Sequence, residues 1–260
     1  NQTDAICFNG STGTVTLAAA DGTPNYLYGV SGTTLTNNPL ITGMSAGNYT
    51  IIVQDNNSCT VALNVIIGQP LLPVSVSVTS TTDVLCYGSA TGVLNVLAFD
   101  GFAPYNYTLG PNTNTNGLFN NLAAGNYTVN ITDNNGCVAS VNATINQPLT
   151  ALSVTIPTAS NPICNGFNTG TATALASGGT SALGYTYSWN TTPIQNAAQA
   201  NSLISGSYTV TVVDDNLCTA TATVVLTEPN FQLTTSTSLT ICDGQAANLS
   251  ATSLDGASPV

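Results

Sequence analysis

The chain has 260 residues and contains no Lys, no Arg and no His. Its 11 Asp and Glu residues give a net charge of −11, yet charged residues make up only 4% of the chain, against about 25% in a typical globular domain. This composition excludes a histidine base, a catalytic lysine and an arginine clamp. It also excludes nucleic acid and anionic membrane surfaces as partners, because both are negatively charged.

Hydrophobic residues make up 43% of the chain, which is enough to form a core. No stretch approaches the roughly 20 apolar residues of a membrane span, so we expect no direct membrane insertion. The first residues, Asn1-Gln2-Thr3-Asp4, include neither an initiator Met nor a signal region. We therefore expect the chain to be a piece of a longer, processed protein.

Seven cysteines mark an internal repeat. The first cysteines of successive units lie 78 or 79 residues apart, and in three units a second cysteine follows after 51 to 54 residues. A period of this length with strands inside it indicates an array of small domains. The predicted units are residues 1–70, 71–148 and 149–229, with the start of a fourth at 230–260. The cysteines are Cys7, Cys59, Cys86, Cys137, Cys164, Cys218 and Cys242.

The second and third units each begin with a predicted opening strand. Residues 74–78 and 152–156 alternate between apolar and polar side chains ahead of the first cysteine. The first unit has only six residues before Cys7, so we expect its opening strand to be missing. In each unit a turn dipeptide follows the next strand, where a positive φ is tolerated. These dipeptides are Asp21-Gly22, Asp100-Gly101 and Gly178-Gly179.

The later segments of each unit also follow a period of two. In the second unit Tyr127, Val129 and Ile131 alternate with polar residues, which is typical of a half-buried strand. The residues after the second cysteine repeat the alternation, so that this cysteine shares the core-facing parity. We count about seven short strands per unit and find no helical period. The sequence therefore predicts an all-β protein, a tandem array of immunoglobulin-like β-sandwiches of about 78 residues with one disulfide each.

A Gly-x-Tyr-Thr motif opens the penultimate strand of each unit. A tyrosine at this position often forms a tyrosine corner, in which its hydroxyl bonds to backbone. The alternative is a tyrosine that only fills the core. The candidate corner residues are Tyr49, Tyr127 and Tyr208.

The cysteine spacing predicts one disulfide inside each unit: Cys7 with Cys59, Cys86 with Cys137, and Cys164 with Cys218. Cys242 is then unpaired in this chain. A loop of this length contributes ~4 kcal/mol in the chain-entropy model. Disulfides also place the protein outside the cytosol. Zinc or a catalytic cysteine is disfavoured, because the chain has no His and no closely spaced cysteine pair.

The order of the motifs carries a resemblance. In the second unit they read Cys86-Tyr87-Gly88, Pro104-Tyr105-Asn106-Tyr107, Leu122-Ala123-Ala124-Gly125-Asn126-Tyr127-Thr128-Val129, Asp133-Asn134-Asn135-Gly136-Cys137 and Gln147-Pro148. This order is similar to the SprB repeat of very large cell-surface adhesins that serve gliding motility in Bacteroidetes, and the similarity covers nearly the whole chain. The third unit departs from the pattern, since it lacks the Pro of the aromatic motif and has Leu217 where Gly precedes the second cysteine.

The resemblance implies a protein exported by the type IX secretion system and displayed as an outer-membrane-associated filament that a motor moves. Its implied partners are further repeats of the same long chain and the secretion and motility machinery at the outer membrane. The residues themselves predict an extracellular shaft segment, because sandwiches joined by short Pro-containing linkers have few ways to bend.

Catalysis would have to rely on carboxylates, and two of them must converge on one site. Asp214 and Asp215 are adjacent and would point to opposite faces of a strand. Asp55, Asp133 and Asp214 recur at one position of the repeat, whereas a catalytic site needs a unique one. We therefore expect that the protein is not an enzyme.

Calcium is the only cofactor that the sequence suggests. Asp4 and Asp83 precede the first cysteine of their units by three residues, and Asp55 and Asp133 precede the second by four. A disulfide inside each unit would bring these pairs together. Two carboxylates are few for the six to eight oxygen ligands of calcium, and the alternative is that they cap turns. We otherwise expect no cofactor and no metal site.

Surface polysaccharide is a further candidate partner, and it would make the protein a carbohydrate-binding or matrix protein with tandem sandwich modules. Aromatic residues recur at alternate positions of one strand and could form a binding platform, although such residues are also typical of a core. An exposed Trp189 would favour carbohydrate binding. The aromatic residues are Tyr26, Tyr28, Tyr105, Tyr107, Tyr185, Tyr187 and Trp189.

Overall fold

The computed structural model describes residues 1–229. Within them every regular element is a β-strand, so the predicted all-β class is confirmed. No helix that could cross a membrane occurs among these residues. The predicted fourth unit, with Cys242, lies outside the described residues.

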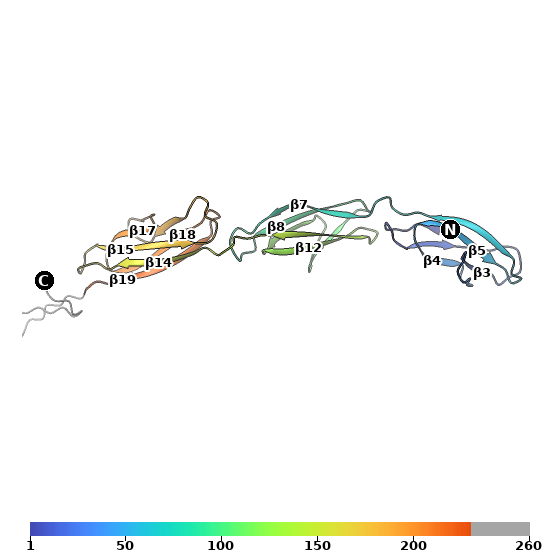
Figure 1. Ribbon diagram of the computed structural model, residues 1–260, viewed down its shortest axis with the longest axis horizontal. Coiled ribbons are helices and arrows are strands. Elements are labelled where there is room, and N and C mark those ends of the chain that lie inside the picture. Colours follow the sequence, from blue (N-terminus) through green and yellow to red (C-terminus); the bar gives the residue numbers. More distant parts are fainter. Residues whose placement is uncertain (230–260) are drawn as a thin grey trace, which may run out of the picture. The chain divides into compact units, whose positions relative to one another are not determined.

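The strands fall into three groups that match the three predicted units (Figure 1). The first group is β1 (Gln2–Thr3), β2 (Gly13–Thr16), β3 (Leu27–Val30), β4 (Leu40–Met44), β5 (Gly47–Gln54) and β6 (Thr60–Ile67). The second is β7 (Ser75–Thr82), β8 (Gly92–Phe99), β9 (Asn106–Leu109), β10 (Asn112–Asn114), β11 (Leu118–Leu122), β12 (Gly125–Thr132) and β13 (Val138–Ile145). The third is β14 (Ser153–Ser160), β15 (Gly170–Ser177), β16 (Thr186–Trp189), β17 (Gln199–Leu203), β18 (Gly206–Val213) and β19 (Thr219–Leu226).

Each group forms two antiparallel sheets, as an immunoglobulin-like sandwich requires. The first has the orders β1-β2-β4 and β3-β5-β6, the second β11-β8-β7 and β10-β9-β12-β13, and the third β14-β15-β17 and β16-β18-β19. The register follows the alternation in the sequence, because core-facing residues such as Val129 and Val141 lie opposite each other across β12 and β13. We refer to these groups as the first, second and third sandwich.

The chain separates into two compact units. One consists of Asn1–Asp83 and Ala90–Asn146, and so holds the first sandwich and most of the second. The other contains Val84–Ser89 together with the described residues from Gln147 onward. The short segment between β7 and β8 is therefore grouped with the third sandwich.

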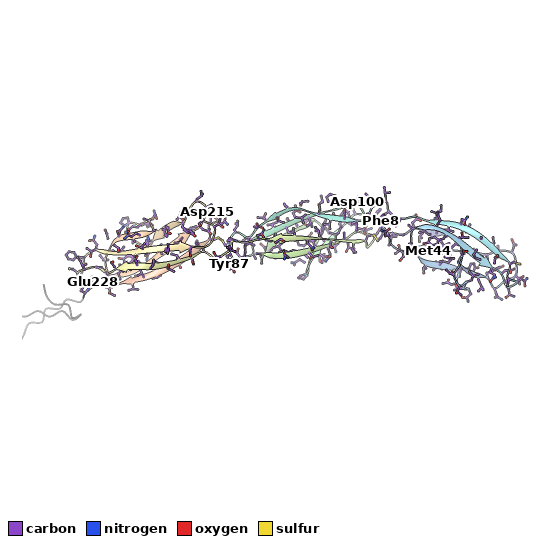
Figure 2. All side chains as sticks on the ribbon, viewed as in Figure 1. Phe8, Met44, Tyr87, Asp100, Asp215 and Glu228 are labelled. Atoms are coloured by element: carbon purple, nitrogen blue, oxygen red, sulfur yellow. A yellow bond between two sulfur atoms is a disulfide. The ribbon has the colours of Figure 1, made fainter. Side chains whose placement is uncertain are left out.

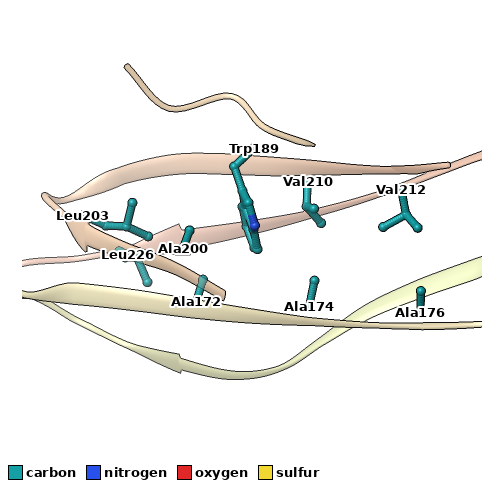
Figure 3. Close-up of a cluster of buried hydrophobic side chains, with 9 residues drawn as sticks. All are labelled: Ala172, Ala174, Ala176, Trp189, Ala200, Leu203, Val210, Val212 and Leu226. Atoms are coloured by element: carbon teal, nitrogen blue, oxygen red, sulfur yellow. The ribbon is translucent and has the colours of Figure 1, made fainter. Parts of the chain in front are cut away.

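The core of each sandwich lies between its two sheets. In the third sandwich Trp189 of β16 is 1% exposed and extends toward β15, which presents Ala172 and Ala174 (Figure 3). In the second sandwich the corresponding positions hold the larger Leu94 and Val96, and the residue of β9 that corresponds to Trp189 is the smaller Leu109. Because interiors are closely packed, a larger residue on one sheet requires smaller ones on the other.

The first sandwich differs from the others at its opening strand. β1 has 2 residues, whereas β7 and β14 have 8 each. β7 and β14 lie beside the last strands of their sandwiches, β13 and β19. In the first sandwich the matching face of β6 remains open, and Leu63 on that strand is 53% exposed.

Candidate functional site: the cysteine-bearing turns

The second cysteine of each sandwich ends a tight turn that we call the head turn, residues 55–59, 133–137 and 214–218. An aspartate opens each turn. In the second sandwich Asp133 is 5% exposed, and its carboxylate accepts hydrogen bonds from the backbone N–H groups of Asn135 (2.9 Å), Cys137 (2.8 Å) and Phe102 (2.9 Å). The recurring aspartate therefore fastens the turn and the preceding β8–β9 loop to each other.

The other two head turns repeat this arrangement. Asp214 accepts from the N–H groups of Asn216, Cys218 and Thr180. Asp55 accepts from those of Asn57, Cys59 and Thr23. The pKa of Asp55 lies below its ordinary value, mainly because of the Thr23 N–H and then that of Cys59, while partial removal from water works in the opposite direction and the Asn57 N–H adds a further lowering.

The residue before each second cysteine has a left-handed backbone. φ is +68° at Ser58, +84° at Gly136 and +64° at Leu217. Glycine adopts this region without strain, whereas a branched side chain rarely does. The head turn of the third sandwich therefore has the same backbone geometry as that of the second, but Leu217 makes it more strained.

The first cysteine of each sandwich lies in a loop before its second strand, which we call the tail loop: residues 6–10, 85–89 and 163–167. The residue two positions after the cysteine has a positive φ, which is +56° at Asn9, +75° at Gly88 and +74° at Gly166. Its N–H donates to a side-chain oxygen of the residue before the closing Pro. The pairs are Asn9 with Gln69 (2.7 Å), Gly88 with Gln147 (2.8 Å) and Gly166 with Glu228 (2.9 Å).

These bonds place the tail loop beside the end of the last strand of its own sandwich. In the first sandwich a second contact agrees, because the N–H of Gly68 donates to Asp4 at 2.8 Å. In the sequence, the closing Gln-Pro or Glu-Pro marks only the end of each unit. The structure shows that the side-chain oxygen of this Gln or Glu holds the tail loop. The sequence signal for this role was the recurrence of Gln or Glu at one repeat position.

The two cysteines of one sandwich therefore lie at opposite ends of its last strand. Cys59 precedes β6 and the tail loop of Cys7 adjoins the end of β6. The 8 residues of β6 separate the two ends by roughly 26 Å at ~3.3 Å per residue. A disulfide requires Cα atoms within about 7 Å, so the predicted pairing of Cys7 with Cys59 is impossible in this fold.

The structure pairs Cys7 with Cys137 and Cys86 with Cys218. The Cα–Cα distances are 5.6 Å and 5.7 Å, inside the ordinary range for a disulfide. This corrects the predicted pairings Cys7–Cys59, Cys86–Cys137 and Cys164–Cys218. The second cysteine of each unit does share the parity of the core-facing residues in the strand that follows it. Parity, however, fixes only the face of a strand and not the end at which a residue lies.

Both disulfides follow one rule: the tail loop of one repeat is bonded to the head turn of the next. Around Cys137 the tail-loop side chains Ile6 and Phe8 line a hollow of about 360 Å³ together with Val74 and Phe102 (Phe8 is labelled in Figure 2). Around Cys218 the side-chain amide of Asn216 donates to the backbone oxygen of Leu85 at 2.9 Å.

Cys59 and Cys164 are exposed and are not in disulfides. Cys59 is a head-turn cysteine and Cys164 a tail-loop cysteine, so each is of the type that bonds to a neighbouring repeat. By contrast, Cys137 and Cys218 are 7% and 8% exposed.

The three candidate corner tyrosines make equivalent hydrogen bonds. The hydroxyl of Tyr49 donates to the backbone oxygen of Ser45 at 3.0 Å. Tyr127 donates to Ala123 at 2.8 Å, and Tyr208 donates to Ile204 at 3.1 Å. Each bond reaches back four residues, as expected of a tyrosine corner that holds the chain before the penultimate strand.

The recurring aromatic residues do not form an exposed row. Trp189 is buried, and its indole N–H donates to the backbone oxygen of Ala197 at 3.1 Å. Tyr28 and Tyr107 belong to the core. Tyr26, Tyr105 and Tyr185 are partly exposed, and each bonds back to its own turn, as when Tyr105 donates to the backbone oxygen of Asp100 at 2.6 Å. Tyr187 packs against the core.

The aspartates considered as calcium ligands lie at different ends of a sandwich. Asp4 is engaged by the Gly68 N–H beside the tail loop, and Asp55 is engaged in the head turn. Within residues 1–229, no three Asp, Glu, Cys or His residues cluster as a metal site would require.

A family model described as SprB repeat matches residues 1–34, 78–114 and 156–193. One match falls in each of the three units, so the resemblance is confirmed and the chain carries three SprB repeats. No curated protein matches the chain in sequence. SprB repeats and disulfides together make this an extracellular, cell-surface repeat protein.

Several solved arrays of sandwich domains are similar to this chain. The three N-terminal domains of the Hoc outer capsid protein of bacteriophage RB49 are 12% identical over 86% of this chain and 95% of theirs, with a TM-score of 0.30. Extracellular domains 3–5 of Drosophila OTK are 14% identical over 86% and 94%, with a TM-score of 0.26. The eight N-terminal Ig domains of DSCAM are 11% identical over 88% of this chain but 36% of theirs, with a TM-score of 0.33. Likeness at this level says nothing about function.

Proposed function

We propose that the repeats form a non-catalytic, load-bearing stretch of the shaft of a long filament on the cell surface. The observation that supports this is the repeat-to-repeat disulfide. Residues 68–74 join the first two sandwiches through the backbone, and Cys7–Cys137 joins them a second time. A linker doubled by a covalent bond restricts bending and bears tension that would otherwise fall on the backbone linker alone.

The two disulfides also overlap along the chain. Residues 86–137 lie inside both the loop closed by Cys7–Cys137 and the loop closed by Cys86–Cys218. The shortest covalent path from Cys7 to Cys218 therefore passes only through these residues. Fully extended, this path spans about 180 Å, against about 740 Å along the whole backbone between the same two residues. The overlap thus limits how far the chain can lengthen if its sandwiches unfold.

Single-molecule stretching of the full chain between its ends tests the mechanical part of this proposal. With disulfides intact, the stretch from Cys7 to Cys218 should reach only about a quarter of the extended length that it reaches after reduction, as the two path lengths above require. Equal extended lengths before and after reduction contradict a load-bearing role for the bonds.

The finer proposal is that this filament is a gliding adhesin, exported by type IX secretion and moved along the outer membrane. Its support is the SprB repeat itself. Living cells of the source organism, labelled with a fluorescent antibody against the chain, should show filaments that travel along the cell. Label that stays fixed, or that is found only in shed material, contradicts the motility role and leaves a static stalk or matrix protein.

A further inference from the structure

The head turn of the first sandwich has every part of the two head turns that are bonded to a tail loop. Asp55, Asn57 and Cys59 repeat the pattern of Asp133, Asn135 and Cys137. Asp55 makes the same three backbone contacts as its counterparts. Within residues 1–229 no tail loop is bonded to this head turn, and Cys59 is exposed.

The surface beside Cys59 is hollowed in the same place. A hollow of about 330 Å³ is lined by Asp21, Gly22, Asp55 and Cys59. The equivalent residues Asp100, Gly101, Asp133 and Cys137 line a hollow together with Ile6 and Phe8 of the bonded tail loop. The bonded head turn of the second sandwich therefore shows what kind of segment the hollow beside Cys59 fits.

The side-chain amide of Asn57 occupies the repeat position whose N–H donor binds a tail-loop carbonyl in the third sandwich. In the third sandwich the side-chain amide of Asn216 donates to Thr180 at 3.0 Å and to the tail-loop carbonyl of Leu85 at 2.9 Å. Asn57 makes the first of these bonds, to Thr23 at 2.7 Å. Its second amide hydrogen is the one that in Asn216 holds the backbone of the tail loop.

The complementary surface is the tail loop of Cys164. Gly166 and Glu228 hold it as Gly88 and Gln147 hold the loop of Cys86. Ile163 before the cysteine is 72% exposed, whereas Leu85 at the same position of a bonded loop is 48% exposed. An exposed large apolar residue next to an exposed cysteine has the chemistry of the segment that a head turn binds.

We infer that the head turn of Cys59 is a docking site for the tail loop of another SprB repeat, and that the loop of Cys164 is the matching plug for another head turn. On docking, the two thiols form a disulfide: they release two protons and pass two electrons to a small-molecule disulfide or a disulfide oxidase, which is reduced to two thiols. The inference rests on the linkage behind the proposed shaft, but its failure would leave the two observed disulfides and their mechanical role intact.

Two variants of the full chain test this, both also carrying Cys242→Ser so that the cysteine outside the described residues cannot take part in the exchange. Cys59→Ser keeps only the plug, and Cys164→Ser keeps only the docking site. Mixed in a glutathione redox buffer, they should form a one-to-one dimer through Cys164 and Cys59, in at least about tenfold excess over either homodimer. Pairing at the statistical ratio, or no dimer at all, overturns the inference.

Asn57→Ala, added to the Cys164→Ser variant, separates docking from thiol reactivity. The heterodimer should then form several-fold more slowly, because the tail-loop carbonyl loses its donor. The Cys59–Cys59 homodimer, which does not use this contact, should form at an unchanged rate. Equal slowing of both dimers, or no slowing of the heterodimer, contradicts the docking geometry.

Discussion

The head ends of the first and second sandwiches have the same sequence pattern but differ in their surroundings. In the second, Cys137 is bonded to a tail loop, and Asp133 is 5% exposed. In the first, Cys59 is exposed and Asp55 is only partly buried. The turn itself is unchanged, since both aspartates make the same three bonds. The turn therefore forms from local contacts alone, and the tail loop adds a covalent bond to a preformed surface.

The largest expected difference between the two ends comes from removing the cysteine. Cys137→Ser breaks the disulfide and should lower the free energy of unfolding by about 3–5 kcal/mol, since the bond closes a long loop. Cys59→Ser removes a cysteine at the same repeat position and should change it little. Denaturant unfolding of both variants measures this. Equal effects of the two substitutions contradict the pairing.

Substitution of the two aspartates should lower stability in the same order as substitution of the two cysteines, with the larger effect in the second sandwich. Asp133→Asn replaces a buried carboxylate that accepts three backbone bonds, and it should cost about 2–3 kcal/mol of stability. Asp55→Asn removes an equivalent but better-solvated group and should cost less. The measurement is again denaturant unfolding. A larger effect at Asp55 contradicts the ranking of the two aspartates by burial.

The third head turn extends the comparison to the backbone conformation of the residue before the cysteine. Leu217→Gly should stabilise the third sandwich by about 0.5–1 kcal/mol, because glycine adopts the left-handed conformation without strain. Gly136→Ala should destabilise the second sandwich by a similar amount. Thermal unfolding of the two variants should show shifts of opposite sign, and shifts of the same sign contradict the turn assignment.

The smallest expected effect concerns pH. The pKa of Asp55 in the folded chain lies below the ordinary value of an aspartate. Its contribution to stability is therefore full above pH ~4, the ordinary value for an unfolded Asp, and is lost as the pH falls through the lower folded value. Acid titration of the wild-type chain and of Asp55→Asn should show a steeper loss for the wild type. Parallel curves contradict the role of the Thr23 and Cys59 N–H groups.

The fold could be predicted from the sequence because its signals are local. Alternation at Tyr127, Val129 and Ile131 specifies a strand and its buried face, and the recurring cysteines specify the period. The corner tyrosines were identifiable for the same reason, since their bonds reach back only four residues.

The disulfide pairing could not be predicted from the same signals. The alternation of apolar and polar residues indicates which face of a strand a cysteine shares, but not the end of the strand at which it lies. In the second sandwich that end depends on the hairpin turn at Asp133 and on the loop held by Gln147. The bond then joins residues 130 positions apart. A clue was present, because a Gly or Asn two positions after the first cysteine recurs together with a closing Gln-Pro or Glu-Pro, and the two proved to be bonded to each other.

The most direct test of the account is a disulfide map of the full chain under non-reducing conditions. Trypsin cannot cut a chain without Lys or Arg, so the digest should use a protease that cleaves at Asp or at aromatic residues. We expect linked peptides that contain Cys7 with Cys137 and Cys86 with Cys218. Peptides linking Cys7 with Cys59 or Cys86 with Cys137 would contradict the repeat-to-repeat linkage, and with it the proposed shaft.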